Sequence, residues 1–261
     1  GLNMVASFDD PACVVIKHNN PCGAAAGGTL AQVVDRAFQG DPVSAFGSIV
    51  AINRQIDVAT AEFLATGNFF VEAIVCPGFD QEALRILTTQ PKWKKNVRLL
   101  ECPLPMPNPG RLDMRRVHGG MLVQQSDDLK LDSSGWKLAT DHKVSDELTA
   151  ELAFAWNMVR FVKSNAIVLV RDRALCGVGA GQMSRVDAVR IAIEKAADRA
   201  VGSVLASDAF FPFPDSIEIA AQAGIAAVIQ PGGSVKDDDV IAACQQHDLP
   251  MVLTGRRHFL H

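Results

Sequence analysis

The sequence predicts an α/β protein, in which a sheet packs between layers of helices. Short apolar segments of strand length recur along the chain, and Gly, Pro or polar residues end each of them. Between them lie stretches with helical spacing of apolar residues and with capping residues at their starts. Strands that alternate with helices in this way are typical of α/β sandwiches with parallel connections.

In the first half of the chain, helices separate the expected strands. Thr29 followed by Gln32 has the capping-box pattern, and Gly40 is placed to end the helix that begins there. The polar segment 17–23 contains Pro and Gly and is expected to be a turn. Strands are expected at 13–16, 49–52 and 73–76, and a second helix at 57–66.

The second half repeats this order after a proline-rich connector at 101–110 and a polar excursion at 127–141. A long helix is expected after Ser145, since two carboxylates lie in its first turn, where the helix dipole favours them. Because the halves share one order of elements, we expect two subdomains, 1–143 and 144–261. Strands are expected at 166–170, 175–181, 203–206, 226–229 and 251–253. Two helices are expected to begin at the caps Ser184 and Asp215, and a third helix is expected to run through Cys244.

Composition and charge exclude several classes of protein. Of the 261 residues, 48% are apolar and 21% charged, which is ordinary for a globular chain. A net charge of -4 argues against a broad surface for nucleic acid, and no apolar run approaches the ~20 residues of a membrane span. The six cysteines form no Cys-x-x-Cys pair, so we expect a reduced, cytoplasmic protein without a zinc module.

Chemically informative residues follow several expected strands, where ligands bind in parallel α/β sheets. Lys17 and His18 come directly after the first strand. A histidine can move a proton near neutral pH, and the adjacent lysine favours its neutral form. A surface histidine beside a solvated lysine is the alternative. The loop 177–182 leads to Arg185 at a helix start, which suits an anion, although Gln182 breaks the dinucleotide fingerprint.

Other loops carry weaker signals. The loop 210–213 holds three phenylalanines, which form either a platform for a flat ring or part of the core. Asp215 either caps a helix or binds a ring amine. The pair 256–257 is either a phosphate clamp or solvated, and Cys22 is either a nucleophile or a buried thiol. The loops after Ile52 and Val75 are also candidates for a ligand site, because each follows an expected strand.

Six motifs occur in an order that resembles the formyltransferase half of the bifunctional AICAR formyltransferase/IMP cyclohydrolase family. The resemblance runs along the whole chain. The motifs are KHNNPCG at 17–23, DPVSAFG at 41–47, VHGGMLVQ at 117–124, KSNAI at 163–167, GAGQMSR at 179–185 and SDAFFPF at 207–213.

This resemblance implies a fold and a reaction. The fold is a duplicated cytidine-deaminase-like three-layer sandwich without zinc, and a homodimer shares the active site. The reaction is that of phosphoribosylaminoimidazolecarboxamide formyltransferase in de novo purine (IMP) biosynthesis. The 5-amino group of AICAR attacks the formyl carbon of the co-substrate 10-formyltetrahydrofolate, giving formyl-AICAR and tetrahydrofolate. No metal is required, and an IMP cyclohydrolase domain completes the full-length protein.

The resemblance also assigns roles to residues by motif. His18 is the implied proton acceptor, Lys17 its helper, and Asn165 holds the AICAR carboxamide. The other implied AICAR contacts are Gly47, Glu72, Arg185, Phe210 and Arg257. The implied folate contacts are Val186, Asp215, Ser234 and Val235.

The sequence departs from the family at one point. The formyltransferase half of the family opens with an Arg-Tyr-Gly-Glu-Asn-Pro segment that contacts the nucleotide, and this chain contains no tyrosine. The resemblance therefore implies a domain truncated at its start, and a nucleotide-binding fragment without turnover is the alternative to an active enzyme. A zinc deaminase is disfavoured, because position 20 is Asn and no second cysteine follows Cys22 at the required spacing.

Overall fold

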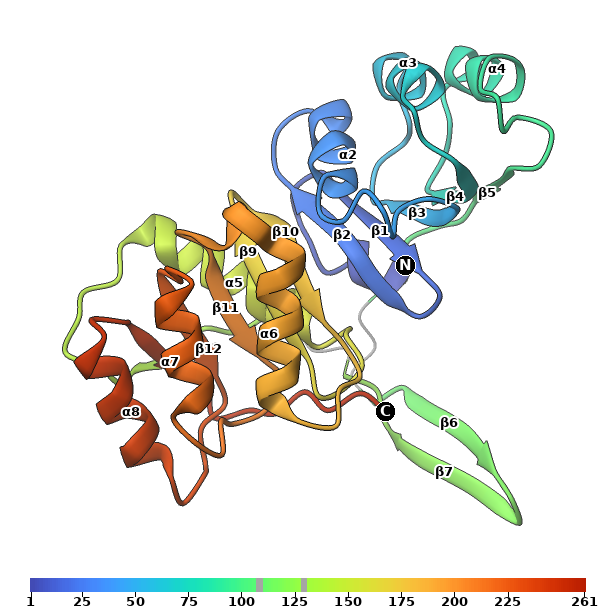
Figure 1. Cartoon of the computed structure of the whole chain (residues 1–261). Helices are drawn as coiled ribbons and strands as arrows, with labels where there is room; N and C mark the ends of the chain where they lie inside the picture. Colours follow the sequence, from blue (N-terminus) through green and yellow to red (C-terminus); the bar gives the residue numbers. More distant parts are fainter. Residues whose placement is uncertain (107–109, 128–130) are drawn as a thin grey trace.

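The computed structural model describes residues 1–106, 110–127 and 131–261. Most of its strands form one 11-stranded sheet in the order β5-β4-β3-β1-β2-β10-β9-β11-β12-β13-β8 (Figure 1). The strands are β1 (Ala12–Lys17), β2 (Asn20–Ala26), β3 (Ser48–Ile52), β4 (Val71–Cys76), β5 (Arg98–Glu101), β6 (Leu112–Val117), β7 (Gly120–Gln125), β8 (Lys137–Leu138), β9 (Ile167–Arg171), β10 (Ala174–Gly179), β11 (Val204–Ser207), β12 (Ala227–Gln230) and β13 (Met251–Leu253). The helices are α1 (Leu2–Val5), α2 (Leu30–Phe38), α3 (Val58–Thr66), α4 (Gln81–Thr89), α5 (Asp146–Val159), α6 (Arg185–Ala196), α7 (Asp215–Gln222) and α8 (Asp237–Gln246), with a 3-10 turn at Ala197–Ala200.

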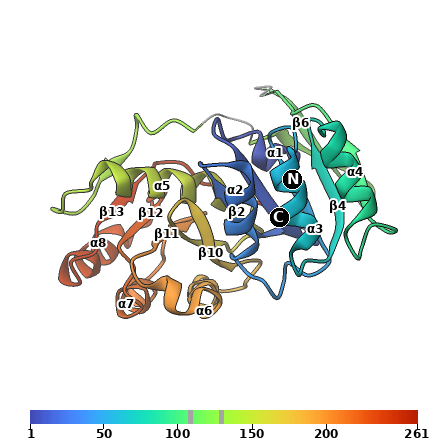
Figure 2. The ribbon, with the colours of Figure 1, turned by 90° about the horizontal axis from the view of Figure 1, so that it is seen from above.

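Helices cover both faces of the sheet, which confirms the predicted α/β sandwich. Side chains alternate between the faces of each strand. Val15 and Leu169 therefore pack under α2–α4 and α6–α8, whereas Val14 and Val168 pack on the opposite face against α5 and α1. Figure 2 shows α5 on one side of the sheet and α6 and α7 on the other.

The same succession of elements occurs twice along the chain. A hairpin, a helix and three parallel strands joined by helices make up β1 to β5, and the same order makes up β9 to β13. The two hairpins meet in the middle of the sheet, where Ala25 of β2 pairs with Ala174 of β10. The subdomain boundary at residue 143 stays a prediction; β8, just before it, pairs with β13 of the second half.

The predicted parallel connections occur within β3–β5 and within β11–β13, but the sheet as a whole is mixed. β1 runs antiparallel to β2 and β3, and β9 runs antiparallel to β10 and β11. We call the end of the sheet at which β1 finishes the site end. The registers place the carboxyl ends of β10–β13 there, together with the starts of β3–β5. The candidate loops after Ile52 and Val75 therefore lie at the opposite end.

The segment 17–23 also differs from its predicted turn. Only His18 and Asn19 turn, and β2 begins at Asn20. This strand is hard to recognise from the sequence because most of its side chains are small, with three alanines and a glycine. Gly23 is required by packing, since a Cβ there would overlap the Ala37 carbonyl oxygen of α2.

Most predicted helix starts are confirmed by their hydrogen bonds. Thr29 and Gln32 form the capping box of α2, while Ser145 and Ser184 accept the capping bonds of α5 and α6. The cap predicted at Asp215 is wrong, because Pro214 occupies the N-cap and Asp215 is the first residue of α7. Helix α4 and the hairpin β6–β7 have no counterpart in the sequence prediction. Of the proline-rich connector, 107–109 lie outside the described residues.

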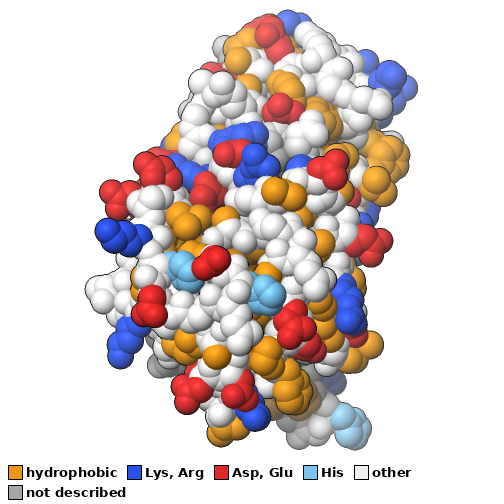
Figure 3. Space-filling model, turned by 60° about the vertical axis from the view of Figure 1, so that its left-hand side comes forward, with side chains coloured by type: hydrophobic (Ala, Val, Ile, Leu, Met, Phe, Trp, Pro, Cys, Tyr) orange, Lys and Arg blue, Asp and Glu red, His pale blue; other side chains and the backbone are white. Residues whose placement is uncertain are grey.

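The surface carries both signs of charge. On the face drawn in Figure 3, acidic and basic side chains are interspersed. Among the described residues, no helix combines the length and the apolar character needed to cross a membrane.

Candidate active site

Loops and strand ends from both halves carry the candidate site residues at the site end of the sheet. In the first half they flank β1, β3 and β4, and in the second half they follow β10–β13 or precede β9. The rule that ligands bind at the carboxyl ends of parallel strands would have found only part of this set of residues. The sheet is wide, so the hydrogen bonds decide which residues come together.

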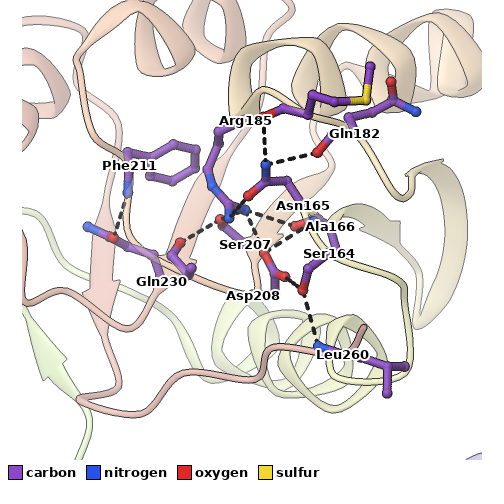
Figure 4. A network of polar contacts seen from close by, with 12 residues as sticks. Ser164, Asn165, Ala166, Gln182, Arg185, Ser207, Asp208, Phe211, Gln230 and Leu260 are labelled. Carbon is purple, nitrogen blue, oxygen red and sulfur yellow. Dashed lines mark hydrogen bonds and ion pairs between the residues drawn. The ribbon is translucent and has the colours of Figure 1, made fainter. Parts of the chain in front are cut away.

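A buried ion pair organises the second-half part of this end (Figure 4). Nη1 of Arg185 lies 2.5 Å from Oδ1 of Asp208 and also donates to the Ser207 hydroxyl at 2.8 Å. The Asp208 side chain is fully buried and that of Arg185 is 5% exposed. Charges buried this deeply persist in proteins when they are paired and fully hydrogen-bonded. The pair is therefore a rigid support rather than a free cation for a ligand.

The support holds Asn165 in one orientation. Arg185 donates from Nη2 to Asn165 Oδ1 at 2.7 Å, and both Asn165 amide hydrogens are taken up by the carbonyl oxygens of Gln182 and Met183, at 2.9 and 3.2 Å. With its donors engaged, Asn165 has only the second lone pair of Oδ1 to offer. Asn165 can therefore accept a hydrogen bond from a ligand N–H, such as a carboxamide or an amine.

The residue before Asn165 ties the same network to the end of the chain. The Ser164 hydroxyl donates to Asp208 Oδ2 and accepts from the Leu260 amide at 3.1 Å. The Ser164 amide in turn donates to the Leu260 carbonyl at 2.9 Å. Segments that are far apart in sequence thus converge on one buried carboxylate.

Lys17 and His18 lie at the turn between β1 and β2. The Lys17 ammonium donates to the carbonyl oxygens of Phe46 and Gly47 at 2.7 and 3.1 Å. Gly47 has a φ of +69°, and a Cβ there would lie 3.3 Å from Lys17 Nζ, so glycine suits both the backbone and the approach. His18 is exposed, and its ring has no hydrogen-bond partner among the described residues, which leaves it open to a ligand.

A single hydrogen bond joins this hairpin to the Asn165 loop. The amide of Lys163 donates to Asn20 Oδ1 at 3.0 Å. Asn20 lies two residues after His18, and Lys163 two residues before Asn165. The structure therefore places the two loops that carry the three predicted catalytic residues next to each other.

The phenylalanine loop after β11 divides between core and surface. Phe211 is fully buried, and its amide donates at 3.3 Å to Oε1 of Gln230, which is also fully buried. Phe210 is half-buried and Phe213 is exposed. The loop is thus anchored through Phe211 and keeps aromatic surface available on either side of it.

The predicted folate contacts lie near the starts of three helices. Val186 is the second residue of α6, Asp215 is the first of α7, and Ser234 and Val235 precede α8. Val235 is 100% exposed. Helix starts carry partial positive charge, so this row of helices suits an anionic ligand.

The side chains of two predicted AICAR contacts take no part in the hydrogen bonds of the Asn165 network. Glu72 pairs with Arg98 at 3.0 Å on the outer strands β4 and β5. Strand β4 is five positions from β9 in the sheet, or about 24 Å at the usual strand spacing. Arg257 is exposed and has no hydrogen bond or ion pair among the described residues. It is available to a phosphate, whereas Glu72 is engaged.

Sequence reasoning missed the residues that build the support. Asp208 and Ser164 stand within recognised motifs, yet neither was given a role. The available signal was an aspartate directly after an apolar strand, because a charge buried there requires a cation such as Arg185.

The surroundings of Cys22 do not activate it as a nucleophile. Burial, together with the negative charge of Asp41, raises the pKa of the Cys22 thiol to about 11, so the thiol stays neutral near pH 7. No group of three or more potential metal ligands occurs among the described residues.

The fold and the site together define a class. This is an α/β sandwich with repeated topology, whose site end offers one exposed histidine, a fixed amide oxygen, an exposed arginine and three helix starts. Such a site suits a phosphorylated ligand that presents N–H donors.

Comparison with known proteins identifies the family. The family described as "AICARFT/IMPCHase bienzyme" matches residues 1–195. The bifunctional purine biosynthesis protein PurH of Rhodopirellula baltica is 57% identical over 261 residues, covering 100% of this chain and 50% of the relative. The PurH protein of Halalkalibacterium halodurans is 46% identical over 260 residues with the same coverage, and that of Cereibacter sphaeroides is 50% identical over 274 residues. The chain therefore belongs to the AICARFT/IMPCHase bienzyme family, and it spans about half the length of these relatives.

Proposed function

We propose that this chain carries the formyltransferase reaction of purine biosynthesis, from 10-formyltetrahydrofolate to the 5-amino group of AICAR. The observation that carries the proposal is the hydrogen bond from Lys163 to Asn20, because it joins the Lys17–His18 hairpin to the Asn165 loop. A proton acceptor, a cation and a fixed amide oxygen are the groups that this reaction needs, and no metal is called for.

In the proposed mechanism, each group acts at a stated atom. The amine nitrogen of AICAR forms a bond to the formyl carbon, and the free imidazole nitrogen of His18 takes the proton that the amine loses. The Lys17 ammonium stabilises the oxyanion with the one hydrogen that the carbonyls of Phe46 and Gly47 do not take, since both Asn165 amide hydrogens are bonded to carbonyls. When the intermediate collapses, the bond to N10 of the folate breaks and N10 takes up a proton, which gives formyl-AICAR and tetrahydrofolate.

Substrate orientation follows from the same geometry. Oδ1 of Asn165 accepts from the carboxamide of AICAR, and Arg257 contacts its phosphate. The folate lies across the helix starts at Val186, Asp215 and Ser234–Val235, where its carboxylates meet partial positive charge. Phe210 and Phe213 provide aromatic surface for the flat rings.

A second copy of the chain completes the site in this proposal. The hairpin β6–β7 pairs with no other strand of the described chain and extends away from the sheet (Figure 1). It exposes apolar side chains along its length. An isolated two-stranded hairpin is marginally stable in water, so we expect it to pack against a partner protomer. The exposed apolar residues are Leu112, Met114, Val117, Met121, Leu122 and Val123.

The test is formyl transfer by the purified chain, with the Rhodopirellula baltica relative assayed in parallel. His18→Ala is expected to lower turnover at least about a hundredfold while AICAR binding stays within a few-fold. His247→Ala, which changes an exposed histidine at the end of α8, is the matched control and should leave turnover unchanged. Unchanged turnover in His18→Ala would remove the proton-acceptor role.

The alternative is a fragment that binds the nucleotide without turnover, and the same assay separates it. The chain spans about half the length of its relatives, which keeps this alternative open. AICAR binding without transfer by this chain, beside transfer by the longer relative, would favour it. For the dimer, light scattering should give a dimeric mass for the native chain and a lower mass for Leu122→Lys.

A further inference from the structure

One carboxylate holds two of the three consecutive basic residues 256–258. Asp127 Oδ2 contacts Nδ1 of His258, and Asp127 Oδ1 lies 3.3 Å from Nη2 of Arg256. His258 is 6% exposed, and its ring packs on Trp156 with the centroids 4.8 Å apart. Asp127, in contrast, comes from a segment that is about 130 residues earlier in the chain.

Arg257 stands between these two bound residues and has no partner in the part of the chain that the structure describes. Arg256 and His258 both reach the Asp127 carboxylate, whereas Arg257 forms no hydrogen bond or ion pair with it. Arg257 is exposed and makes no hydrogen bond or ion pair among the described residues.

The same segment, residues 254–261, which we call the strap, also bonds to the buried network at the site. The His258 amide donates to the Asp208 carbonyl at 2.9 Å. The Leu260 amide donates to the Ser164 hydroxyl at 3.1 Å, and the Lys163 ammonium donates to the His261 carbonyl at 2.7 Å. The strap is thus fixed along its backbone to the Asn165 loop, and by side chains to Asp127.

We propose that Asp127 and His258 are positioning residues that orient Arg257 toward the phosphate of the nucleotide. The inference rests on the proposed function, since it takes AICAR as the ligand. Asp127 neutralises the two flanking cations and leaves Arg257 as the free charge. Holding the strap in advance also removes part of the entropy that ordering Arg257 would cost on binding.

The charge state of Asp127 fits this role. Burial works to raise its pKa, but the hydrogen bond from His258, with the charges of His258, Arg160 and Arg256, lowers the pKa below its usual value. Asp127 is therefore a carboxylate across the neutral range. The backbone carbonyl of Asp127 also accepts a long hydrogen bond of 3.4 Å from Arg160, so Asp127 is anchored to the end of α5.

The test compares two ligands that differ only in the phosphate. Calorimetry measures the affinity of the chain for AICAR and for the unphosphorylated riboside, in the native chain and in Asp127→Asn, His258→Ala and Arg257→Ala. We expect Asp127→Asn and His258→Ala to weaken AICAR binding about tenfold and riboside binding less than twofold, as Arg257→Ala does more strongly. His258→Asn keeps a donor near the position of Nδ1 and should restore most of the affinity. His247→Asn is the matched control and should change neither ligand.

A structural role and a positioning role give different results. Equal losses for both ligands in Asp127→Asn, or no loss for either, would overturn the proposal. Thermal melts of the milder His258→Asn and Asp127→Asn variants verify that the fold is kept. If the native chain prefers AICAR and only Arg257→Ala removes the preference, the positioning role alone fails. If the native chain binds both ligands equally, the phosphate role of Arg257 fails as well, and the proposed function loses that contact.

Discussion

The two halves of the sheet are built from the same succession of elements, yet they present opposite ends to the candidate active site. In the second half, β11–β13 end at the site end and α6, α7 and α8 begin there. In the first half, β3–β5 begin at the site end, so α3 and α4 start at the far end. The repeated topology therefore places different structural features of each half at the site end.

The opposite directions give each half a different chemistry. Helix starts carry partial positive charge and free amides, so the second half is suited to anions. The first half brings instead the turn of its hairpin, with Lys17 held on the carbonyls of Phe46 and Gly47 and His18 exposed. In the second half, the equivalent hairpin turn holds Asp172 and Arg173 and lies at the far end of the sheet, because β9 and β10 run opposite to β1 and β2. One topology thus presents helix starts at the site end in one half and a hairpin turn with a lysine and an exposed histidine in the other.

The largest expected effect comes from breaking the support that only the second half has. Asp208→Ala leaves the buried Arg185 without its carboxylate, and we expect the free energy of unfolding to fall by about 3–5 kcal/mol. Urea unfolding followed by circular dichroism measures the loss. Asp208→Asn keeps an acceptor and should cost less.

The matched control for that experiment is an exposed pair on the same helix. Arg190→Ala breaks a 3.3 Å contact with Asp187, and both side chains are more than half exposed. We expect a change within about 0.5 kcal/mol. Similar losses for Asp208→Ala and Arg190→Ala would contradict the view that the second half is organised around its buried pair.

The next prediction concerns a feature that the two halves share, which is the close packing of a helix on a glycine of the hairpin. A Cβ on Gly23 would overlap the carbonyl oxygen of Ala37 in α2, and one on Gly179 would overlap that of Ala188 in α6. Gly23→Ala and Gly179→Ala should each lower the free energy of unfolding by about 2–3 kcal/mol, as in other overpacked cores. Gly120→Ala is the control, since a Cβ there meets nothing within 4 Å. A large loss at only one of the two glycines would mean that helix and hairpin pack differently in the two halves.

Helix caps provide a smaller comparison between the same two helices. Thr29 accepts from the Gln32 amide at 3.4 Å, and Ser184 accepts from the Asp187 amide at 3.2 Å. We expect Thr29→Ala and Ser184→Ala each to cost about 1 kcal/mol in thermal or urea unfolding. Thr88→Ala, in the last turn of α4, removes a hydroxyl that caps no helix start and should cost less than either. No loss at Thr29 would show that the capping box adds nothing in the first half.

The smallest effect concerns pH and the helix α5. Burial raises the pKa of Glu151, whose carboxylate accepts two bonds from the Arg173 amide at 2.8 and 3.0 Å. A raised carboxyl pKa means that the folded state binds more protons, so its contribution is present below the usual pKa of about 4.3 and is lost as pH rises through the folded value. Glu151→Gln should therefore gain stability relative to the native chain between about pH 4 and neutrality, by roughly 1 kcal/mol or less.

Glu147, one turn earlier in α5, serves as the opposite control. The Glu147 amide and the Ser145 hydroxyl, both hydrogen-bonded to its carboxylate at the start of the helix, lower its pKa. Its stabilising contribution is present above the usual pKa and lost as pH falls. Urea unfolding at several pH values should thus give opposite trends for Glu151→Gln and Glu147→Gln, and parallel trends would contradict the burial argument.

Much of the fold could be predicted because its signals are local. Apolar runs gave β3, β9 and β13, and the caps at Thr29, Ser145 and Ser184 fixed three helix starts to the residue. These signals act between residues three or four apart, so the sequence contains them directly. The failures at β2 and β6–β7 have the opposite cause. The residues of β2 are mostly small, and those of β6 and β7 are all exposed, so neither segment has the buried apolar run by which the other strands were recognised.

Part of the site could also be predicted. The motif residues Lys17, His18, Asn165 and Arg257 were all named, and the structure leaves His18 and Arg257 free of partners among the residues it describes. The role of Asp208 could not be predicted. Its partners come from the start of β9, from α6 and from the strap, and no spacing in the sequence connects them.

The sequence by itself determined the class of fold and most of the helix starts, and it named candidate site residues, because each of these rests on a residue's own chemistry or on its near neighbours. Only the tertiary structure decided the direction of each half of the sheet, and with it which loops share the site end. It also decided that Arg185 is a buried support, and that Asp127 reaches across the chain to Arg256 and His258. These outcomes depend on strand pairing and on the burial of charge, which are set by contacts between residues that lie far apart in the sequence.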